Sequence, residues 1–573
     1  MCGIAGYINW NDHEIDCGYI VEQMLSLMQY RGPDDNGIYE SKSLAIGMNR
    51  LRIIDKIAYA VPYISSSKQS VLAYNGEVYN HDALRNRLSG LRFKTNSDGE
   101  SILEDIEHFG LKHLREYNGM YSFAFHDVSK SKLYLVRDKA GEKPVYYYHS
   151  DEIFCFASEI KALLPINEID NKIVLTNAYQ SYEFAVGRET LLDGIQQLLP
   201  GEYLELDLLK QEVTIHKYFE LRDELIEIPD NEIQVENHLA DLIEDSIKLR
   251  TKNCAHQFAV FTGGGVDSAL MACIANPDEL YYCHYDLGKA FDELEYAQLV
   301  AEQIDVPLNI IEPRKVDFER TRDKIAFHLD TPCTWTSFSL WMILESLPKH
   351  IKVIMTGEGA DEAFGGYHRY HLLHHDEQIN KLQAMQDYSY LIQKYYGSPV
   401  ERYVKLINRC TNKYDQKVLE YLNKTVSKYF DTVDGDIIHG MGMHDFYTTM
   451  QVLLQMSDRM SMAFSVENRS PFLDYRLLQF AFSLPSKYKI RDGLTKWLLK
   501  KVARRFIPKA IVDRIDKRGF SAPLNIWFGW DKLGKYNRSM YRDIVFQDFK
   551  GIVQTLDTKP YASRRPKEDL IVS

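Results

Sequence analysis

The 573-residue sequence predicts two large domains: a layered α+β domain, followed by an α/β domain that is built on a parallel sheet and has many helices. Two observations carry this prediction. Up to about residue 220, short aromatic and β-branched runs separated by Gly, Asn or Asp turns are typical of antiparallel strands. Beyond that point, strand, glycine loop and helix follow one another at 257–275 and again at 352–364. This alternation favours parallel strands with ligands at their carboxyl ends.

The first domain is expected to span residues 2–220. Its strand-like runs are IAGYIN, SVLAYNGEVYN, SFAFHDV, KLYLVRD, VYYYHS and IFCFASE. The runs VEQMLSLMQY and SILEDIEHFGLKHLREY have helical spacing instead. The polar stretch 221–232 is interpreted as a linker to the second domain.

The second domain is expected to span residues 233–535. It opens with the helical run ENHLADLIEDSIKLRT, followed by the buried strand QFAVFT, three glycines and the helix VDSALMACIA. From about residue 370 the sequence turns helical, and we treat 370–435 as a helical insertion. The end of the chain, 536–573, carries few core residues and is predicted to be a flexible tail.

Composition excludes several classes of protein. A net charge of −13 disfavours non-specific binding to nucleic acid or to an anionic membrane. The eight cysteines include no CxxC pair and are too sparse for a disulfide framework, which favours a reducing compartment. The sequence has no apolar run of membrane-spanning length and no secretory signal at MCGIAGYINW. We therefore expect a cytoplasmic protein without nucleic-acid or membrane partners.

Cys2 is the first candidate for chemistry. Removal of Met1 would leave a thiol and a free α-amine on one residue, although its position alone favours an ordinary strand cysteine. Asn75 and Gly76 are suitable donors for an oxyanion at a turn. Arg50 and Asp98 could hold the carboxylate and the ammonium of an α-amino acid.

A glycine loop is the second candidate. In TGGGVDS (262–268), three glycines between a strand and a helix let backbone N–H groups approach a phosphate. The loop matches neither the Walker pattern nor GxGxxG. Asp267 beside a phosphate suggests Mg²⁺, and Asp361 at the end of the second strand–loop unit could supply a matching ligand.

Together these blocks resemble a known family. MCGIAGY, RGPDD, YNGEVYN, RDKAGEKPVYY and FASEIKALL resemble the N-terminal nucleophile (class II) glutamine amidotransferase domain, whose fold is an αββα sandwich. GGGVDSA, TGEGADEAFGGYHRY, DRMSMAFSVENRSPFLDYRL and the stretch from GLTKWLLKKVARR to DKRGFSAPLNIWF resemble the ATP-pyrophosphatase half of glutamine-hydrolysing asparagine synthetase. The resemblance runs from Cys2 to about Trp527 and makes Cys2 the expected nucleophile.

The resemblance implies roles in the first domain. Cys2 would attack the glutamine amide, and its own α-amine would handle the proton. Asn75 and Gly76 would form the oxyanion hole. Glutamine would be held by Arg50, Glu77 and Asp98. The ammonia released would travel inside the protein to the second site.

In the second domain the resemblance implies that ATP converts a carboxylate into an acyl-adenylate and releases pyrophosphate. The pyrophosphate would be held by Gly263, Gly264, Gly265, Asp267 and Ser268. Asp267 and Asp361 would bind Mg²⁺, and Thr262, Thr356 and Gly357 would lie against the adenosine. Glu358 would take a proton from the attacking ammonia, and Lys496 would neutralise charge on the phosphates.

Two departures from the family pattern affect the acceptor and the nucleotide. The phosphate loop normally reads SGGxDS, and Gly263 replaces its first serine. Aspartate-specific synthetases are expected to carry a Thr-Thr-Ile-Arg-like stretch, whereas residues 331–339 read TPCTWTSFS, with no arginine to pair with an α-carboxylate. Trp335 and Phe338 offer apolar or stacking surface there instead.

The leading hypothesis is a glutamine-dependent ligase that consumes ATP and converts aspartate to asparagine. One alternative keeps the chemistry and changes the acceptor, for example to a sugar acid or a natural-product precursor. A second alternative is a regulatory homologue that synthesises nothing. The Tyr- and Lys-rich stretch 380–430 is interpreted as amphipathic packing or an oligomer contact, which leaves a homodimer open.

Overall fold

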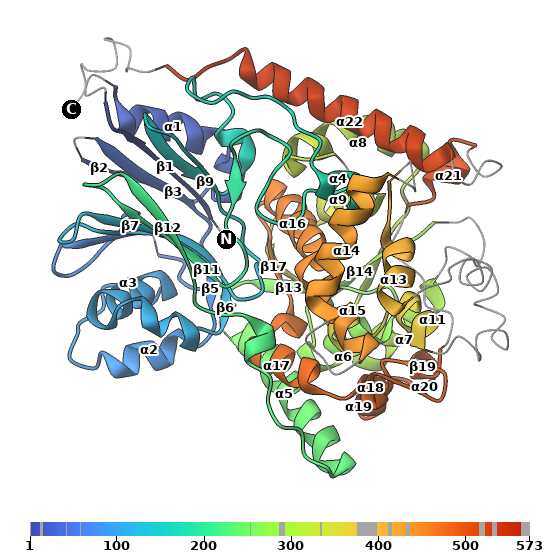
Figure 1. Cartoon of the computed structure of the whole chain (residues 1–573). Helices are drawn as coiled ribbons and strands as arrows, with labels where there is room; N and C mark the ends of the chain where they lie inside the picture. Colours follow the sequence, from blue (N-terminus) through green and yellow to red (C-terminus); the bar gives the residue numbers. More distant parts are fainter. Residues whose placement is uncertain are drawn as a thin grey trace.

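The computed structural model describes residues 2–11, 15–41, 43–57, 59–252, 254–285, 293–332, 335–374, 398–410, 415–430, 436–514, 522–529 and 536–562. Figure 1 shows the N-terminal part, in blue to teal, beside a larger helical C-terminal part. As the sequence predicts, the first part contains antiparallel sheets and the second a parallel sheet with many helices.

The N-terminal domain stacks two antiparallel sheets. The first has the order β10-β8-β9-β1-β3-β2 and the second β12-β11-β7-β6-β5-β4. The strands of the first sheet are β1 (Gly3–Asn9), β2 (Asp35–Ser41), β3 (Leu44–Arg50), β8 (Tyr146–His149), β9 (Ile153–Ala157) and β10 (Gln196–Gln197). Those of the second are β4 (Tyr63–Ile64), β5 (Ser70–Val78), β6 (Gly119–Asp127), β7 (Lys132–Arg137), β11 (Glu202–Asp207) and β12 (Glu212–Lys217).

Helices cover the outer faces of both sheets. Helix α1 (Cys17–Ser26) packs on β1 and β3, and α3 (Asp98–Phe109) packs on β5 with α2 (His81–Arg87) beside it (Figure 1). The inner faces bury aromatic and aliphatic side chains from both sheets in one core. This arrangement is the αββα layering that the family resemblance implies. Helix α4 (Asn177–Tyr182) packs against helix α14 (Gln416–Phe430) of the second domain.

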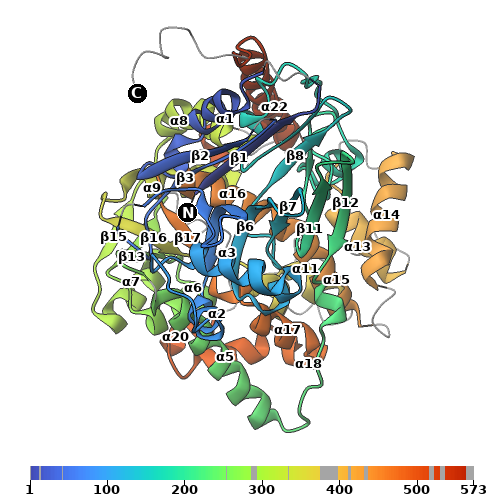
Figure 2. The ribbon, with the colours of Figure 1, turned by 90° about the vertical axis from the view of Figure 1, so that its left-hand side faces the viewer.

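The second domain is built around a parallel sheet of order β15-β14-β13-β16-β17. Its strands are β13 (Gln257–Phe261), β14 (Glu279–Cys283), β15 (Leu308–Ile311), β16 (Ile351–Met355) and β17 (Glu467–Arg469). In both views of the chain, α6 (Val266–Ala275) and α7 (Leu294–Ile304) lie below this sheet, whereas α8 (Lys315–Leu329) and α9 (Trp335–Ser346) lie above it (Figures 1 and 2). Helices on both faces explain why the strands are continuous apolar runs.

The remaining helices surround this core. They are α5 (Glu232–Lys252), α10 (Ala360–Phe364), α11 (His368–His374), α13 (Pro399–Ile407), α14 (Gln416–Phe430), α15 (Ile437–Tyr447), α16 (Thr449–Ala463), α17 (Tyr475–Ser483), α18 (Ser486–Lys489), α19 (Trp497–Ala503), α20 (Lys509–Val512), α21 (Leu524–Trp527) and α22 (Tyr536–Asp557). A short hairpin, β18 (Ile490–Arg491) and β19 (Leu494–Thr495), precedes α19. Among the described residues, no helix is both long and apolar enough to span a bilayer.

The prediction of a flexible tail is wrong for residues 536–562. Helix α22 contacts α8 and runs along the top of the molecule in Figure 1. Its Phe549, Val553 and Leu556 are buried in a cluster with N-terminal residues. Beyond the helix, the Tyr561 hydroxyl donates to the carbonyl of Ala162 at 3.0 Å. The apolar residues of this segment are widely spaced in sequence, and only the helix gathers them on one face.

Buried ion pairs join the two domains. Arg31 contacts both Glu159 at 2.7 Å and Asp458 of α16 at 2.9 Å, and all three side chains are at most 1% exposed. Lys161 contacts Asp330 of the second domain at 2.7 Å. Because such groups are costly to bury without partners, the contacts hold the domains in one arrangement.

Candidate active sites

A cavity in the N-terminal domain begins at Cys2. Cys2 directly precedes β1 and is 6% exposed, and its backbone nitrogen donates to Asn75 Oδ1 at 3.0 Å. The cavity is lined by Cys2, Arg50, Leu51, Ile53, Ile54, Asp55, Tyr63, Tyr74, Gly76, Glu77, Ser97, Asp98 and Glu467. The structure therefore brings together the six residues that the sequence selects in this domain.

Strand pairing explains why these distant residues meet. Gly3 of β1 pairs with Asn49 of β3, which places Arg50 at the end of the strand beside Cys2. Strand β5 carries Asn75, Gly76 and Glu77 consecutively. Asp98 begins α3, and its Oδ2 accepts from the Tyr74 hydroxyl at 2.5 Å and from the N–H of Val78 at 2.9 Å.

Arg50 does not have all its donors free for a ligand. Its Nη1 donates to Asp35 at 2.7 Å and its Nη2 to the carbonyl of Asp55 at 2.8 Å, and its guanidinium lies 3.8 Å from the ring centre of Tyr59. These contacts hold a cation at the cavity wall in a fixed orientation. Such a cation can attract a carboxylate.

Burial sets the protonation of this cavity. It raises the pKa of the Cys2 thiol, and the N–H of Leu51 and the charge of Arg50 only partly oppose the rise. Burial also raises the pKa of Glu77 well above its usual range, although Arg469 lies 3.4 Å away. Cys2 therefore rests as a thiol and needs a nearby base before it can act as a nucleophile.

The glycine loop of the second domain connects β13 to α6. Gly264 has φ +68°, and a Cβ there would lie 2.3 Å from the Cβ of Tyr296, so this position requires glycine. Its N–H donates to Thr262 Oγ1 at 3.4 Å. At Gly263, a Cβ would lie 3.4 Å from Glu293 Oε2 and within 4 Å of no other atom of the described residues, so a serine would fit among them. Gly265 is the N-cap of α6 and Ser268 lies in its first turn.

Asp267, Asp361 and Lys496 converge beside this loop. The Lys496 ammonium contacts Asp267, and it lies 2.7 Å from Asp361 Oδ1. Burial by itself lowers the pKa of Lys496, but the two carboxylates outweigh burial and hold it above its usual value. Gly366 makes this approach sterically feasible, because a Cβ there would lie 1.9 Å from Asp361 Oδ1. One cation thus sits between the two predicted metal ligands.

Glu358 follows β16 and is surrounded by donors. Its Oε1 accepts from the Ser457 hydroxyl, and its Oε2 accepts from Ser470 at 2.9 Å, Thr356 at 3.1 Å and Asn468 at 3.2 Å. Burial raises the pKa of Glu358, and these hydrogen bonds moderate the rise. The Thr356 hydroxyl lies within hydrogen-bond distance of both Asn468 Oδ1, at 2.9 Å, and Glu358 Oε2, at 3.1 Å. A Cβ added to the neighbouring Gly357 would lie 3.1 Å from the Cβ of Asp267.

Strand β17 lies between the two sites, and none of its residues was predicted from the sequence to belong to either site. Glu467 lines the Cys2 cavity, and Arg469 Nε donates to Glu467 at 2.7 Å. Between them, Asn468 donates to Glu358. Because successive side chains of a strand point to opposite faces, one face of β17 meets the Cys2 cavity and the other meets Glu358. The signal was the polar triplet ENR within the largely buried run SVENRSPFLD.

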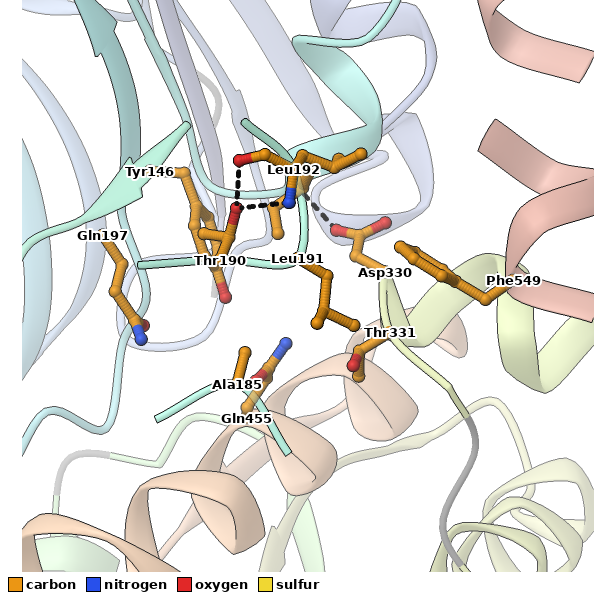
Figure 3. A pocket seen from close by; sticks show the side chains of 11 residues that line it. Tyr146, Ala185, Thr190, Leu191, Leu192, Gln197, Asp330, Thr331, Gln455 and Phe549 are labelled. Atoms are coloured by element: carbon orange, nitrogen blue, oxygen red, sulfur yellow. Dashed lines mark hydrogen bonds between the residues drawn. The ribbon is translucent and has the colours of Figure 1, made fainter. Parts of the chain in front are cut away.

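The predicted acceptor stretch is only partly described. Cys333 and Thr334 lie outside the described residues, as does the side chain of Trp335. Phe338 is fully buried between Phe318 and Trp527, so its ring packs and offers no free stacking surface. Thr331 lines a cavity between the domains with Asp330, Gln455, Tyr146, Leu191 and Phe549 of α22 (Figure 3).

Comparison with known proteins agrees with this division. Residues 238–561 match the family model described as asparagine synthase, and residues 1–219 match the glutamine amidotransferase domain. The chain is 26% identical to asparagine synthetase [glutamine-hydrolyzing] 1 of Bacillus subtilis over 562 residues, which cover 92% of this chain and 88% of that protein. It is 27% identical to a putative asparagine synthetase [glutamine-hydrolyzing] of Mycobacterium bovis, with the same coverage.

Among solved structures, the glutamine phosphoribosylpyrophosphate amidotransferase of B. subtilis aligns with a TM-score of 0.28 and 15% identity, covering 64% of this chain and 77% of that one. The family-model match extends over more than half of the chain. The protein is thus an enzyme that uses glutamine and ATP, and it belongs to the asparagine synthase family, with a glutamine amidotransferase domain in front of the synthase domain.

Proposed function

We propose that this enzyme hydrolyses glutamine at Cys2, passes the ammonia through the protein, and uses it to convert an acyl-adenylate into an amide. Glutamate, AMP and pyrophosphate are the other products. The observation that carries the proposal is the position of β17, because Glu467 lines the Cys2 cavity while the next residue, Asn468, binds Glu358.

In the first half-reaction, the Cys2 thiol attacks the glutamine amide. Once Met1 is removed, the nitrogen that donates to Asn75 becomes the α-amine that accepts the thiol proton. The Asn75 side chain and the N–H of Gly76 stabilise the oxyanion. Glutamine is oriented by Arg50, Glu77 and Asp98, which line the same cavity as the nucleophile Cys2.

Ammonia must stay unprotonated until it reacts, and this requires a route away from bulk water. A buried apolar cluster beside β17 combines residues of both domains, namely Leu51, Ile53, Tyr79, Met120, Val353 and Met462. Leu51 and Ile53 also line the Cys2 cavity. Apart from the hydroxyl of Tyr79, whose pKa burial raises well above its usual value, this lining is apolar and suits the passage of a small neutral molecule.

In the second half-reaction, ATP binds at the glycine loop of Gly263, Gly264, Gly265 and Ser268, with Thr262, Thr356 and Gly357 toward the adenosine. Asp267 and Asp361 fit a divalent cation, because the Lys496 ammonium already stands between them as a positive charge. They would hold Mg²⁺, which would neutralise phosphate charge when bound. Lys496 contributes a further positive charge, and buried Glu358, with its raised pKa, accepts a proton from the attacking ammonia.

Aspartate is the acceptor that we propose first, giving β-aspartyl-AMP and then asparagine. Residues 331–339 contain no arginine that could bind the α-carboxylate of aspartate. The alternative is therefore that the acceptor is another carboxylate, such as a sugar acid or a natural-product precursor. A third outcome is a homologue without synthetic activity. The cytoplasmic location and the homodimer stay predictions from the sequence.

Purified protein supplied with glutamine, ATP, Mg²⁺ and aspartate should form glutamate, AMP and asparagine in equal amounts. Cys2→Ala should lose glutamine use and keep ammonium-dependent AMP formation, whereas Cys17→Ala, a buried cysteine outside the cavity, should keep both. If glutamate is released but AMP formation does not depend on aspartate, aspartate is not the acceptor. A screen of other carboxylates would then identify the acceptor. Failure of every carboxylate to yield AMP would favour the non-synthesising homologue.

A further inference from the structure

Glu142 lies in a loop whose backbone is held by several hydrogen bonds, and it has no role in the reaction proposed above. The loop connects β7 to β8 and folds around the carboxylate of Asp138. Asp138 Oδ1 accepts the N–H groups of Ala140 at 3.0 Å, Gly141 at 2.6 Å and Glu142 at 3.0 Å. Asp138 Oδ2 accepts the N–H of Lys143 at 2.9 Å. These bonds fix the backbone on both sides of Glu142.

The same loop is held against α16 of the other domain. Gln451 Nε2 donates to the carbonyl of Ala140 at 2.9 Å, and Lys143 Nζ lies 3.9 Å from Asp458 Oδ1. Ser457, which precedes Asp458, donates its hydroxyl to Glu358. The loop of the glutaminase domain therefore carries Glu142 into the neighbourhood of Glu358.

The Glu142 side chain is buried without a partner. It is 4% exposed, and its carboxyl makes no hydrogen bond or ion pair with any residue that the structure describes. Glu104, which is 2% exposed, accepts through its Oε1 from the N–H and the hydroxyl of Ser66, whereas its Oε2 accepts no hydrogen bond from the residues that the structure describes. A buried carboxyl without donors is costly, so its retention points to a ligand that supplies them.

The four charged groups around Glu142 come from three parts of the fold. Asp138 and Lys143 lie in its own loop, Arg250 on α5, and Glu358 after β16. Burial raises the pKa of Glu142 to about 8, Asp138 and Glu358 add to the rise, and Lys143 and Arg250 oppose it. Glu142 is thus a proton acceptor that changes its charge in the pH range where ammonium must be deprotonated.

We propose that Glu142 is an ammonia-binding residue on the route from Cys2 to Glu358. When ammonium reaches it, an N–H bond breaks and an O–H bond forms on the Glu142 carboxylate, and the electron pair of the broken bond stays on nitrogen as the lone pair of neutral NH₃ beside Glu358. The nitrogen supplies the donors that the buried carboxyl otherwise lacks. This inference rests on the proposed function, because it needs ammonia to pass between the two sites.

The pH dependence of ammonium use tests the proposal. With ammonium chloride, ATP, Mg²⁺ and aspartate, the wild-type KM for total ammonium should fall as the pH rises and level off near pH 8, where Glu142 ionises. Glu142→Gln can use only free NH₃, so its KM should keep falling about tenfold per pH unit beyond pH 8. At pH 8 it should exceed the wild-type KM about tenfold. Glu104→Gln, an equally buried change remote from the loop, should follow the wild type.

An unchanged pH profile in Glu142→Gln would overturn the proposal, and so would a loss of kcat that is equal at every pH, as expected from a purely structural role. A wild type that forms no AMP with aspartate would count against the proposed acceptor instead. In that case the binding of rubidium, a cation of similar size to ammonium, tests whether Glu142 binds ammonium. Crystals soaked in rubidium chloride at pH 8.5 should show an anomalous peak beside Glu142 that Glu142→Gln lacks, and its absence from the wild type would overturn the proposal.

Discussion

Replacing Lys496 with methionine removes the ammonium between Asp267 and Asp361 and keeps a side chain of similar length. Breaking a fully buried ion pair costs about 3–5 kcal/mol, because the remaining charge is left uncompensated. The Asp267 and Asp361 side chains are 16% and 22% exposed, so we take the lower end, about 3 kcal/mol. For a domain of this size the loss corresponds to a fall in Tm of about 6 °C.

Mg²⁺ should recover most of this loss. A cation present at a hundredfold excess over its Kd stabilises by about 2.7 kcal/mol, or about 5 °C here. In the wild type the gain should be smaller, because Mg²⁺ must first displace Lys496 from the two carboxylates. Differential scanning fluorimetry of both proteins, with and without MgCl₂ and without ATP, measures the difference.

Lys501→Met is the matched control, because Lys501 lies on the same helix α19 and pairs with Glu232 and Glu236 while 33% exposed. Removing a surface pair of this kind costs less than about 1 kcal/mol and creates no cation site. An equal Mg²⁺ shift in the wild type and in Lys496→Met would refute the assignment of Asp267 and Asp361 as a pair that holds the metal.

Three further predictions concern other parts of the chain. Gly76→Ala places a Cβ 2.2 Å from a carbonyl oxygen of β6, so glutamate release should fall at least tenfold. Gly90→Ala, where no atom of the described part of the chain lies within 4 Å of the added Cβ, should be neutral. Phe549→Ala should lower stability by about 3–5 kcal/mol, because Phe549 is 2% exposed. Ile544 on the same helix is 36% exposed, so Ile544→Ala should leave the melting temperature nearly unchanged. Equal melting temperatures for Phe549→Ala and Ile544→Ala would contradict the packing of α22 and favour a flexible tail. For Asp458, burial alone would raise the pKa, but cationic neighbours hold it below its usual value. Its stabilisation is therefore complete above its unfolded pKa and is lost as the pH falls through its folded pKa. Melting temperatures measured between pH 3 and 7 should fall in acid, and Asp458→Asn should flatten that dependence.

Sequence motifs were sufficient to select the residues around Cys2. Cys2, Arg50, the adjacent pair Gly76 and Glu77, and Asp98 come from four separate segments, and the structure places them in one cavity. Each of these residues lies in a motif whose residue types suit glutamine hydrolysis. Strand pairing then restricts how the motifs can be arranged in space. Their catalytic roles stay proposals.

The sequence did not reveal how the two sites are joined. Glu467 and Arg469 belong to a triplet whose function depends on which face of β17 each side chain occupies, and a strand of three residues carries too little periodicity to predict that. Glu142 stands in a motif that was recognised only for its resemblance. Its importance depends on burial without a partner, which sequence spacing cannot report.

The sequence by itself determined the two-domain order, the class of each sheet and the residue types at each site, because these follow from local periodicity and from short motifs. Only the tertiary structure decided that α22 is packed helix, that Lys496 bridges Asp267 and Asp361, and that Arg31 ties Cys2's domain to α16. Such contacts join residues hundreds of positions apart. Their energies depend on burial and on distances of a few ångströms, which exist only after the chain has folded.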